Sequence, residues 1–465
     1  MPLTRVSRSV AISLAIIVLL AAIVQASAYW PGLMTWDAIR QYDQALSGDF
    51  DDWHPPAMGW LWRQFSTAQA GPSPMLILQL SLYWTGFALL AARALRADRW
   101  GLAIALTVAA LMPISLALMG AVLKDCLMAG ALLSASGLLA WVRPGRDAWL
   151  RAIAFALIFA AATLRFNAAL ACLPLAVALL PRRFHATWMR IAGCSVIMGL
   201  ILFCVMPTAN RLIGARSSGV ETSLILFDLG GITEFSGVDV FPALPVANPV
   251  AVNHHCYSPV KWDPYSWWVD EPCPIGFELV RATLKTRHES ATLLWIGAIL
   301  AHPVAYAEHR LDHFNINTRF LVHDEIERPV QVTSVTNIWG YQVTPGLALA
   351  TLDRAALAMA ATPFGWPITW LAIALGVVIA APGLPSRNLA LPLALSALFY
   401  GSGYLVVSVA SEIRYHLWTM LAAAIACVFT ISDVMNGTRL KKGRLVCACL
   451  PVTVVVLLGA VWRAL

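Results

Sequence analysis

The sequence predicts an all-α polytopic membrane protein, a bundle of about 11 and at most about 13 transmembrane helices with an extracytoplasmic loop region. Hydrophobic residues occupy 59% of the 465 positions and charged residues only 12%, whereas soluble domains carry about 25% charged residues. The mean hydropathy is +0.70. The net charge of +7 is spread in small basic groups between apolar runs, a pattern that sets membrane topology and excludes a nucleic-acid-binding patch.

Eleven apolar runs are the expected spans: 10–27, 75–92, 102–118, 126–142, 149–164, 168–180, 191–206, 366–381, 389–410, 417–432 and 445–462. Several are shorter than the ~20 residues that cross the hydrocarbon, so flanking Trp and Arg side chains must extend them. The first run follows Arg5 and Arg8 and ends in Ala26-Ser27-Ala28, which also fits a cleavable signal peptide. We favour an uncleaved span because many more spans follow.

Basic clusters lie between these runs, and with a cytoplasmic N-terminus every one of them falls on the cytoplasmic side. The clusters are Arg93/Arg96/Arg99, Arg143/Arg146/Arg151, Arg182/Arg183/Arg190, Arg387 and Arg439/Lys441/Lys442/Arg444. Nearly all of the acids then face outward, so we expect any chemistry they perform to be extracytoplasmic. The expected domains are a seven-span module at 1–206 with a catalytic first outer loop at 30–73, an extracytoplasmic loop region with interfacial helices at 207–365, and a four-span module at 366–465.

The 207–365 region is the longest stretch without an expected span, and it begins with turn-rich sequence at 227–231. We interpret 291–315 as a helix at the membrane interface, broken near Pro303. The run 347–361 is a poor span because Asp353 lies at its middle. If both segments crossed the membrane, the count would rise to thirteen.

Cys256 and Cys273 share one polar loop, whereas the other cysteines lie in apolar runs. They are disulfide candidates if this loop lies in an oxidising compartment. A zinc site with His254, His255 and Asp263 is the alternative, but the spacing lacks a Cys-x-x-Cys or His-x-x-x-His frame. The pattern therefore favours the disulfide.

Acidic residues crowd the loop after the first span, within WDAIRQYDQALSGDFDDWHPPAMGW at 36–60. Asp37 opens an expected short helix, with Thr35 as its N-cap and Gly48 at its end. The Trp-His-Pro-Pro stretch at 53–56 forms a stiff turn because each proline fixes its own φ. Membrane proteins rarely gather acids beside a span without a use for them, so we interpret this loop as the floor of an active site.

Three further polar groups reach the same outer face on the expected topology. They are Lys124-Asp125 between the third and fourth spans, Arg165-Phe166-Asn167 between the fifth and sixth, and Glu412-Ile413-Arg414-Tyr415-His416 between the ninth and tenth. Their convergence on one face predicts that the four groups form a single site.

The first outer loop, with its early Asp37 and later Trp-His-Pro-Pro turn, resembles the polytopic GT-C glycosyltransferases. It is similar in particular to the bacterial family 39-like group, near the protein mannosyltransferase and aminoarabinose transferase branch. Lys124-Asp125 resembles that family's second acidic loop, His302-Pro303 with Tyr306 and Arg310 its interfacial helix, and Arg414-Tyr415 the Arg-Tyr that opens a late span.

This resemblance implies a GT-C-like bundle in the bacterial cytoplasmic (inner) membrane, with its active face outside the cytoplasm. It also implies a polyprenyl-phosphate sugar donor and inversion at the anomeric carbon by one direct displacement. Many relatives place an Asp-Glu pair in the first loop, whereas Asp37 is followed by Ala38. A divalent cation is the one cofactor left open, and its ligands are unknown.

Transfer of a sugar from a lipid phosphate needs a base for the acceptor's proton and cations for the departing phosphate. Asp37 is the expected base, and Asp125 would position the acceptor or share a divalent cation. Lys124, Arg165 and Arg414 are the phosphate candidates. The other candidate substrate-binding residues are His54, Asn167, Arg310 and Tyr415.

Structural roles remain open for the same residues. Asp37 could complement a helix dipole, and the cations could pair with Asp125 or Glu412. His54 could stabilise the Trp-His-Pro-Pro turn, and Asn167 could cap a turn.

The sequence thus predicts an integral-membrane glycosyltransferase that moves a sugar to a hydroxyl of an envelope lipid, glycan or protein. Its partners would be the donor, that acceptor and membrane lipids. The alternative is a transporter or flippase of a lipid-linked or anionic solute, which would place ionisable groups near the bilayer midplane and show repeated halves. A third interpretation is a structural partner in envelope synthesis, with the acidic loop as a docking surface.

Overall fold

The computed structural model describes residues 5–66, 69–143, 146–323 and 326–465, and over them the chain is helical, with no strand. The chain forms two compact units. The first comprises Met1–Arg216, Arg328–Ser402 and Arg414–Val461, and the second Ser217–Glu327, Gly403–Ile413 and Trp462–Leu465.

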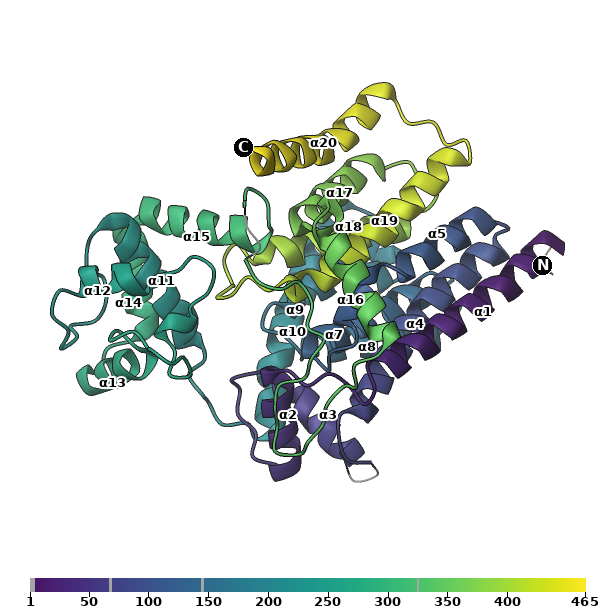
Figure 1. The fold of residues 1–465 in the computed structure, drawn as a ribbon. Helices are drawn as coiled ribbons and strands as arrows, with labels where there is room; N and C mark the ends of the chain where they lie inside the picture. The colour runs from purple at the N-terminus through teal and green to yellow at the C-terminus, as the bar shows by residue number, and fades with distance from the viewer. Residues whose placement is uncertain (1–4, 67–68, 144–145, 324–325) are drawn as a thin grey trace. The chain divides into compact units, whose positions relative to one another are not determined.

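The first unit is a helical bundle (Figure 1). Its helices are α1 (Arg5–Ala28), α2 (Trp36–Ser47), α3 (Ala57–Ser66), α4 (Ser73–Arg96), α5 (Trp100–Ala110), α6 (Pro113–Leu118), α7 (Lys124–Leu139), α8 (Ala148–Ala162), α9 (Ala168–Leu179), α10 (Trp188–Ile213), α16 (Leu347–Ala360), α17 (Pro367–Ala380), α18 (Arg387–Gly403), α19 (Leu417–Met435) and α20 (Lys442–Ala464). Short 3₁₀ turns, among them η1 (Arg182–His185) and η4 (Ile413–His416), lie between some of these helices.

Helix α7 is the core of this bundle. Every residue from Lys124 to Gly137 is buried, and α7 packs against α4, α8, α9 and α19. The crossing with α4 is close because glycines lie on both sides. A Cβ on Gly86 would stand 2.5 Å from Leu133 Cγ, and one on Gly137 would stand 2.9 Å from the Gly86 carbonyl oxygen. Small residues let helices in membranes approach in this way.

Over the described residues, five helices are long and apolar enough to cross a membrane: α1, α4, α10, α19 with its preceding turn, and α20. The bent pair α14 (Ala291–Ala301) and α15 (Pro303–Asn317) makes a sixth if it counts as one span. These helices indicate a membrane protein. They match five of the predicted runs, and the expected count of eleven to thirteen is not confirmed.

Two predicted spans differ from the structure. The run at 102–118 is divided into α5 and α6 because Pro113 lacks the N–H that would continue the helix. The run at 389–410 stays helical only to Gly403, where α18 ends.

The second unit is built around α11 (Glu221–Ser236), which contacts α12 (Pro249–Cys256), α13 (Phe277–Arg287), α14 and α15. The turn predicted at 227–231 is wrong, because this segment lies inside α11. Gly230 and Gly231 serve close packing here. A Cβ on Gly230 would stand 2.3 Å from Tyr265 Oη, and one on Gly231 would stand 2.1 Å from the His309 ring.

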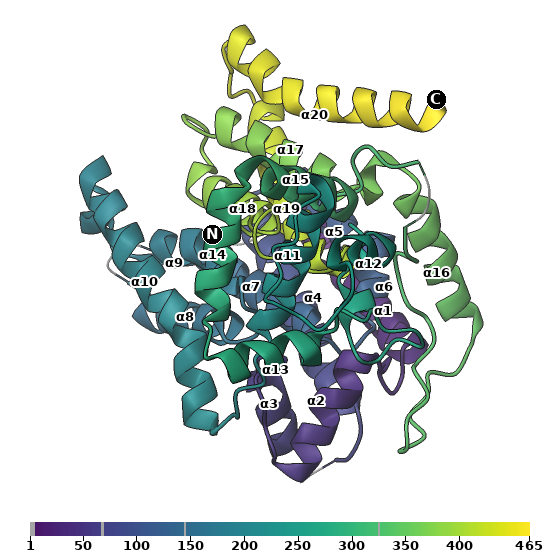
Figure 2. The same cartoon turned by 90° about the vertical axis from the view of Figure 1, so that its left-hand side faces the viewer.

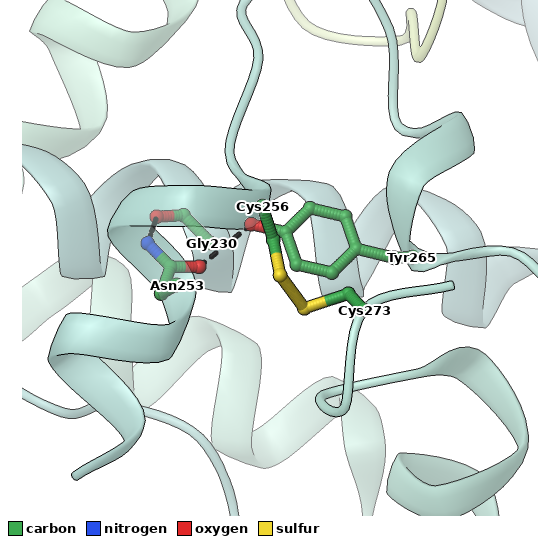
Figure 3. The surroundings of a disulfide bond; sticks show 5 residues. All are labelled: Gly230, Asn253, Cys256, Tyr265 and Cys273. Atoms are coloured by element: carbon green, nitrogen blue, oxygen red, sulfur yellow. Dashed lines mark hydrogen bonds between the residues drawn. A yellow bond between two sulfur atoms is a disulfide. The ribbon is translucent and has the colours of Figure 1, made fainter. Parts of the chain in front are cut away.

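The disulfide expected between Cys256 and Cys273 is present, so the two sulfurs are not free thiolates for zinc (Figure 3). Beside it, Asn253 Nδ2 donates to the Gly230 carbonyl at 3.0 Å, and Tyr265 Oη donates to Asn253 Oδ1 at 2.6 Å. The disulfide loop is therefore tied to the central helix of its unit.

The break predicted near Pro303 is also present. Helices α14 and α15 meet at His302 with a bend of 102°, because Pro303 begins α15 and supplies no N–H across the junction.

Candidate functional site

The helix predicted after the first span is α2, and its caps are those expected. Thr35 Oγ1 accepts a hydrogen bond from the Ala38 N–H at 3.2 Å. Gly48 ends the helix with a φ of 78° and donates its N–H to the Gln44 carbonyl. The N-cap fixes the direction of the first turn, and Asp37 lies in that turn.

A backbone bridge joins the segment before α2 to the segment before α7. The Leu33 N–H donates to the Gly120 carbonyl at 3.2 Å, and the Val122 N–H donates to the Leu33 carbonyl at 3.0 Å. Gln79 of α4 holds the second segment, because its Nε2 donates to the carbonyls of Met119 and Ala121. The start of α2 therefore lies beside the start of α7.

This arrangement brings Asp37 and Lys124 together although they are far apart in the chain. Lys124 Nζ lies 2.9 Å from Asp37 Oδ2, and Arg414 Nη1 lies 3.0 Å from the same oxygen. The side chains are mostly enclosed, with exposed fractions of 18% for Asp37, 8% for Lys124 and 11% for Arg414. One carboxylate oxygen is thus shared by two cations.

His54, from the Trp-His-Pro-Pro turn, completes the surroundings of Asp37. Its Nδ1 lies 2.9 Å from Lys124 Nζ, and its Nε2 lies 3.5 Å from Asp37 Oδ1. An ammonium group only donates, so Nδ1 must accept and the ring proton belongs on Nε2, facing the carboxylate. Burial, and next the neighbouring Lys124, lower the pKa of His54 to about 3, so the ring is neutral at pH 7.

A second ion pair lies beside the first. Asp125, the second residue of α7, pairs with Arg165. The Arg165 guanidinium carbon lies 4.4 Å from the centroid of the Tyr415 ring, and that of Arg414 lies 5.5 Å from it. Tyr415 therefore contacts both arginines and links the two ion pairs into one cluster.

The charges of this cluster do not cancel. Lys124, Arg165 and Arg414 give three positive charges against two negative charges from Asp37 and Asp125, an excess of one. Burial alone would raise the pKa of Asp37, but Arg414, Lys124 and His54 outweigh it and hold that pKa well below 3.8. Asp37 is therefore ionised as the structure stands.

Two predicted residues lie outside these contacts. Asn167 stands at the N-terminus of α9, but its side chain makes no capping hydrogen bond, so the capping alternative is not supported. Its buried Nδ2 has no hydrogen-bond partner among the residues that the structure describes. Arg310 belongs to the second unit, where it pairs with Asp228 and donates to the Ser408 carbonyl.

Two other acids of the first loop, Asp51 and Asp49, pair with arginines outside the cluster. Asp51 pairs with Arg40 at 2.7 Å and also accepts the Trp53 N–H. Asp49 pairs with Arg216. These two carboxylates are therefore held by other arginines than those of the cluster.

Lys124 and Asp125 were expected between the third and fourth spans, but they are the first residues of α7 and are buried. The helix N-terminus favours a carboxylate in its first turn, which fits the place of Asp125.

A divalent cation needs several carboxylate or imidazole side chains whose oxygen or nitrogen atoms are free to bind it. Asp37 instead faces two cationic side chains and Asp125 one, and although Asp125 Oδ2 has no hydrogen-bond partner among the described residues, it is a single oxygen. Within the described ranges, no group of three or more His, Cys, Asp or Glu side chains could hold a metal ion. The donor set does not fit a metal.

Sequence reasoning missed Gln79 and Asp228. Gln79 is a polar residue inside the apolar run 75–92, and that signal could have marked it as a structural contact. Asp228 is fully buried and receives hydrogen bonds or ion pairs from Trp295, His309 and Arg310. No local pattern in the sequence indicates this network.

No protein-family model matches the chain, and neither a curated protein nor a solved structure matches it. The resemblance to GT-C glycosyltransferases therefore rests on the short motifs alone.

Proposed function

We propose that this protein is an integral-membrane glycosyltransferase that moves a sugar from a polyprenyl-phosphate donor to an envelope lipid, glycan or protein hydroxyl. The observation that carries the proposal is the meeting of Asp37 with Lys124 and Arg414. The motif resemblance supplies the reaction class. The cluster supplies what that reaction needs, a carboxylate beside cations with an excess of positive charge.

The donor phosphate would bind Lys124 and Arg414, because it carries the charge that the cluster lacks. It would then compete with Asp37 for these cations. Losing them raises the pKa of a carboxylate, so phosphate binding would turn Asp37 from a counter-ion into a general base. Activation of the base would thus depend on the presence of the donor.

In the transfer step, the acceptor oxygen attacks the anomeric carbon and its proton passes to Asp37. The bond between the anomeric carbon and the phosphate oxygen breaks, and the phosphate leaves with the electron pair. Arg165 and Arg414 would stabilise the charge that develops on the phosphate. Asp125, held by Arg165, would position the acceptor. The free Nδ2 of Asn167 is a donor for a sugar or phosphate oxygen.

An apolar groove supports a lipid-linked donor. Its volume is about 600 Å³, and it lies between the end of α8 and the second half of α10. Its lining residues are Thr163, Leu200, Ile201, Cys204, Val205, Thr208, Ala209 and Leu212. Thr163 stands two residues before Arg165, so a polyprenyl tail in this groove would bring its phosphate towards the cationic cluster.

We further propose eleven to thirteen spans in a bacterial cytoplasmic membrane, with the cluster outside the cytoplasm. The shorter helices α5, α7, α8, α9, α17 and α18 would add six spans to the five long ones, which makes eleven, and α16 with the bent pair α14–α15 would raise the count to thirteen. The disulfide of the second unit fits an oxidising compartment.

The test is sugar transfer by the purified protein from a radiolabelled polyprenyl-phosphate sugar to an envelope glycolipid acceptor. We expect Asp37→Asn to abolish transfer while leaving membrane insertion intact. Asp43→Asn is the matched control, because Asp43 is an exposed acid on the same helix, and it should retain full turnover. Turnover by Asp37→Asn would remove Asp37 from the mechanism. Donor transport without sugar release would favour the transporter.

A further inference from the structure

The opposite end of α10 carries a second groove, about 360 Å³ in volume, in the corner between η1 and the first turns of the helix. It is lined by Arg183, Phe184, Arg190, Gly193, Cys194 and Ile197. Neither its cations nor its walls belong to the cluster around Asp37. Figure 2 shows α10 beside α8 and α9 at one side of their unit.

The corner is a fixed element of the fold. His185 Nε2 donates to the Val177 carbonyl at 2.9 Å, which ties η1 to α9. Thr187 caps α10 by accepting the Arg190 N–H at 3.3 Å, and Arg190 Nη1 donates to the Arg183 carbonyl at 3.1 Å. The two arginines are therefore held at one rim of the groove.

Both guanidinium groups are exposed, and neither pairs with a carboxylate among the described residues. Arg183 lies 4.9 Å from the Phe184 ring, so an aromatic face supports its charge. Two cations on one rim, with no counter-ion from the part of the chain that the structure describes, favour the binding of an anion from outside the chain.

The wall below this rim is apolar and exposed. Ile197, which lines the groove, is 61% exposed, on a helix long and apolar enough to cross a membrane. Trp188, at the start of the helix, is 76% exposed, as expected for an anchor at the membrane interface. A Cβ on Gly193 would meet nothing within 4 Å, so the groove is open beside the cationic rim.

From this geometry we infer that the corner between η1 and α10 is a binding site for one anionic phospholipid. Its phosphate would lie between Arg183 and Arg190, and one acyl chain would run past Gly193 along the wall of α10. Basic pockets beside transmembrane helices recognise anionic headgroups by the same charge complementarity. The site is separate from the proposed glycosyl transfer and does not depend on it.

The inference is tested by native mass spectrometry of the full chain in detergent, titrated with phosphatidylglycerol and, separately, with phosphatidylcholine. We expect selective binding of phosphatidylglycerol. The Arg183→Gln/Arg190→Gln variant should bind it roughly 30-fold more weakly, because each basic group near a membrane surface contributes roughly fivefold in affinity. The control Arg439→Gln/Lys441→Gln removes two exposed charges near another helix and should bind as the unchanged chain does.

A second variant separates the acyl chain from the headgroup. Gly193→Leu fills the groove beside the arginines without changing any charge, and the open space around Gly193 lets the chain fold normally. We expect it to weaken phosphatidylglycerol binding at an unchanged thermal unfolding midpoint. Equal binding of the two lipids, undiminished binding by either variant, or displacement of the lipid by inorganic phosphate alone would overturn the inference.

Discussion

Asp37 has two cations on one oxygen and a neutral imidazole facing the other. Such a carboxylate is a strong counter-ion and a weak base, because the cations that stabilise its charge also lower its pKa. Its proposed role therefore requires the substrate to change its surroundings. Any ligand phosphate that draws Lys124 or Arg414 away would make Asp37 more basic at the moment when a proton has to be accepted.

His54 should make the stability of the protein depend on pH in the acidic range. Its pKa is about 3 in the folded chain and 6.5 as the ordinary value, so the unfolded chain takes up a proton first as the pH falls. Stability should therefore drop by up to about 2 kcal/mol between pH 7 and pH 5 through this group alone. Thermal unfolding in detergent at both pH values checks this.

The control for this prediction is His54→Gln, which should show a smaller loss over the same interval. The titration of Asp37 does not contribute to the loss of stability between pH 7 and pH 5. Its lowered pKa gives a contribution that is fully present above 3.8 and is lost only below that value. An identical loss in the unchanged chain and in His54→Gln would show that the ring is already protonated at pH 5.

The Asp125–Arg165 pair should behave as a buried ion pair, since Asp125 is 1% exposed and Arg165 is 11% exposed. Arg165→Met leaves a buried carboxylate without its cation, which costs about 3–5 kcal/mol. Asp125→Asn/Arg165→Met removes both charges and should recover most of that loss. A double-mutant cycle of thermal unfolding measures the difference, and simple additivity of the two single variants would be the contrary result.

At the scale of the element, the crossing of α4 and α7 controls how precisely the cluster is positioned, because Gln79 is on α4 and Lys124 begins α7. Gly86→Ala should destabilise the bundle by about 2 kcal/mol, since the new Cβ would stand 2.7 Å from the Leu133 carbonyl carbon. Gly101→Ala is the control, because a Cβ there meets nothing within 4 Å. It should be neutral or stabilising by up to about 1 kcal/mol.

Chemical unfolding of the two glycine variants in mixed micelles measures this difference. Equal stability of Gly86→Ala and Gly101→Ala would mean that α4 and α7 separate more easily than their packing indicates.

The sequence predicted elements well where local chemistry decides them. Thr35 and Gly48 delimit α2 because capping needs only neighbouring backbone groups. Pro303 breaks the helix pair for a similarly local reason. Residues 227–231 were misread because Gly230 and Gly231 are a turn signal in isolation, whereas close contacts with Tyr265 and His309 hold them in a helix.

At the scale of the whole molecule, the convergence of four polar groups was predictable from topology, because charges at the ends of spans on one face come near each other. The structure brings together Asp37, Lys124, Arg165 and Arg414, each from a different group. The pairing itself was not predictable. It depends on the backbone bridge at Leu33 and on tertiary packing, for which the sequence carries no local signal.

The most direct test of the proposed site is the affinity of the purified protein for polyprenyl phosphate, which is the donor without its sugar. This affinity is measured for the unchanged chain, for Arg414→Gln and for Asp37→Asn. If the phosphate competes with Asp37 for Lys124 and Arg414, the Arg414→Gln variant should bind polyprenyl phosphate at least about tenfold more weakly than the unchanged chain. Asp37→Asn should bind more tightly than the unchanged chain, because the competing carboxylate is gone. Unchanged or weaker binding by Asp37→Asn would contradict the proposal and leave the cluster as a structural ion-pair network.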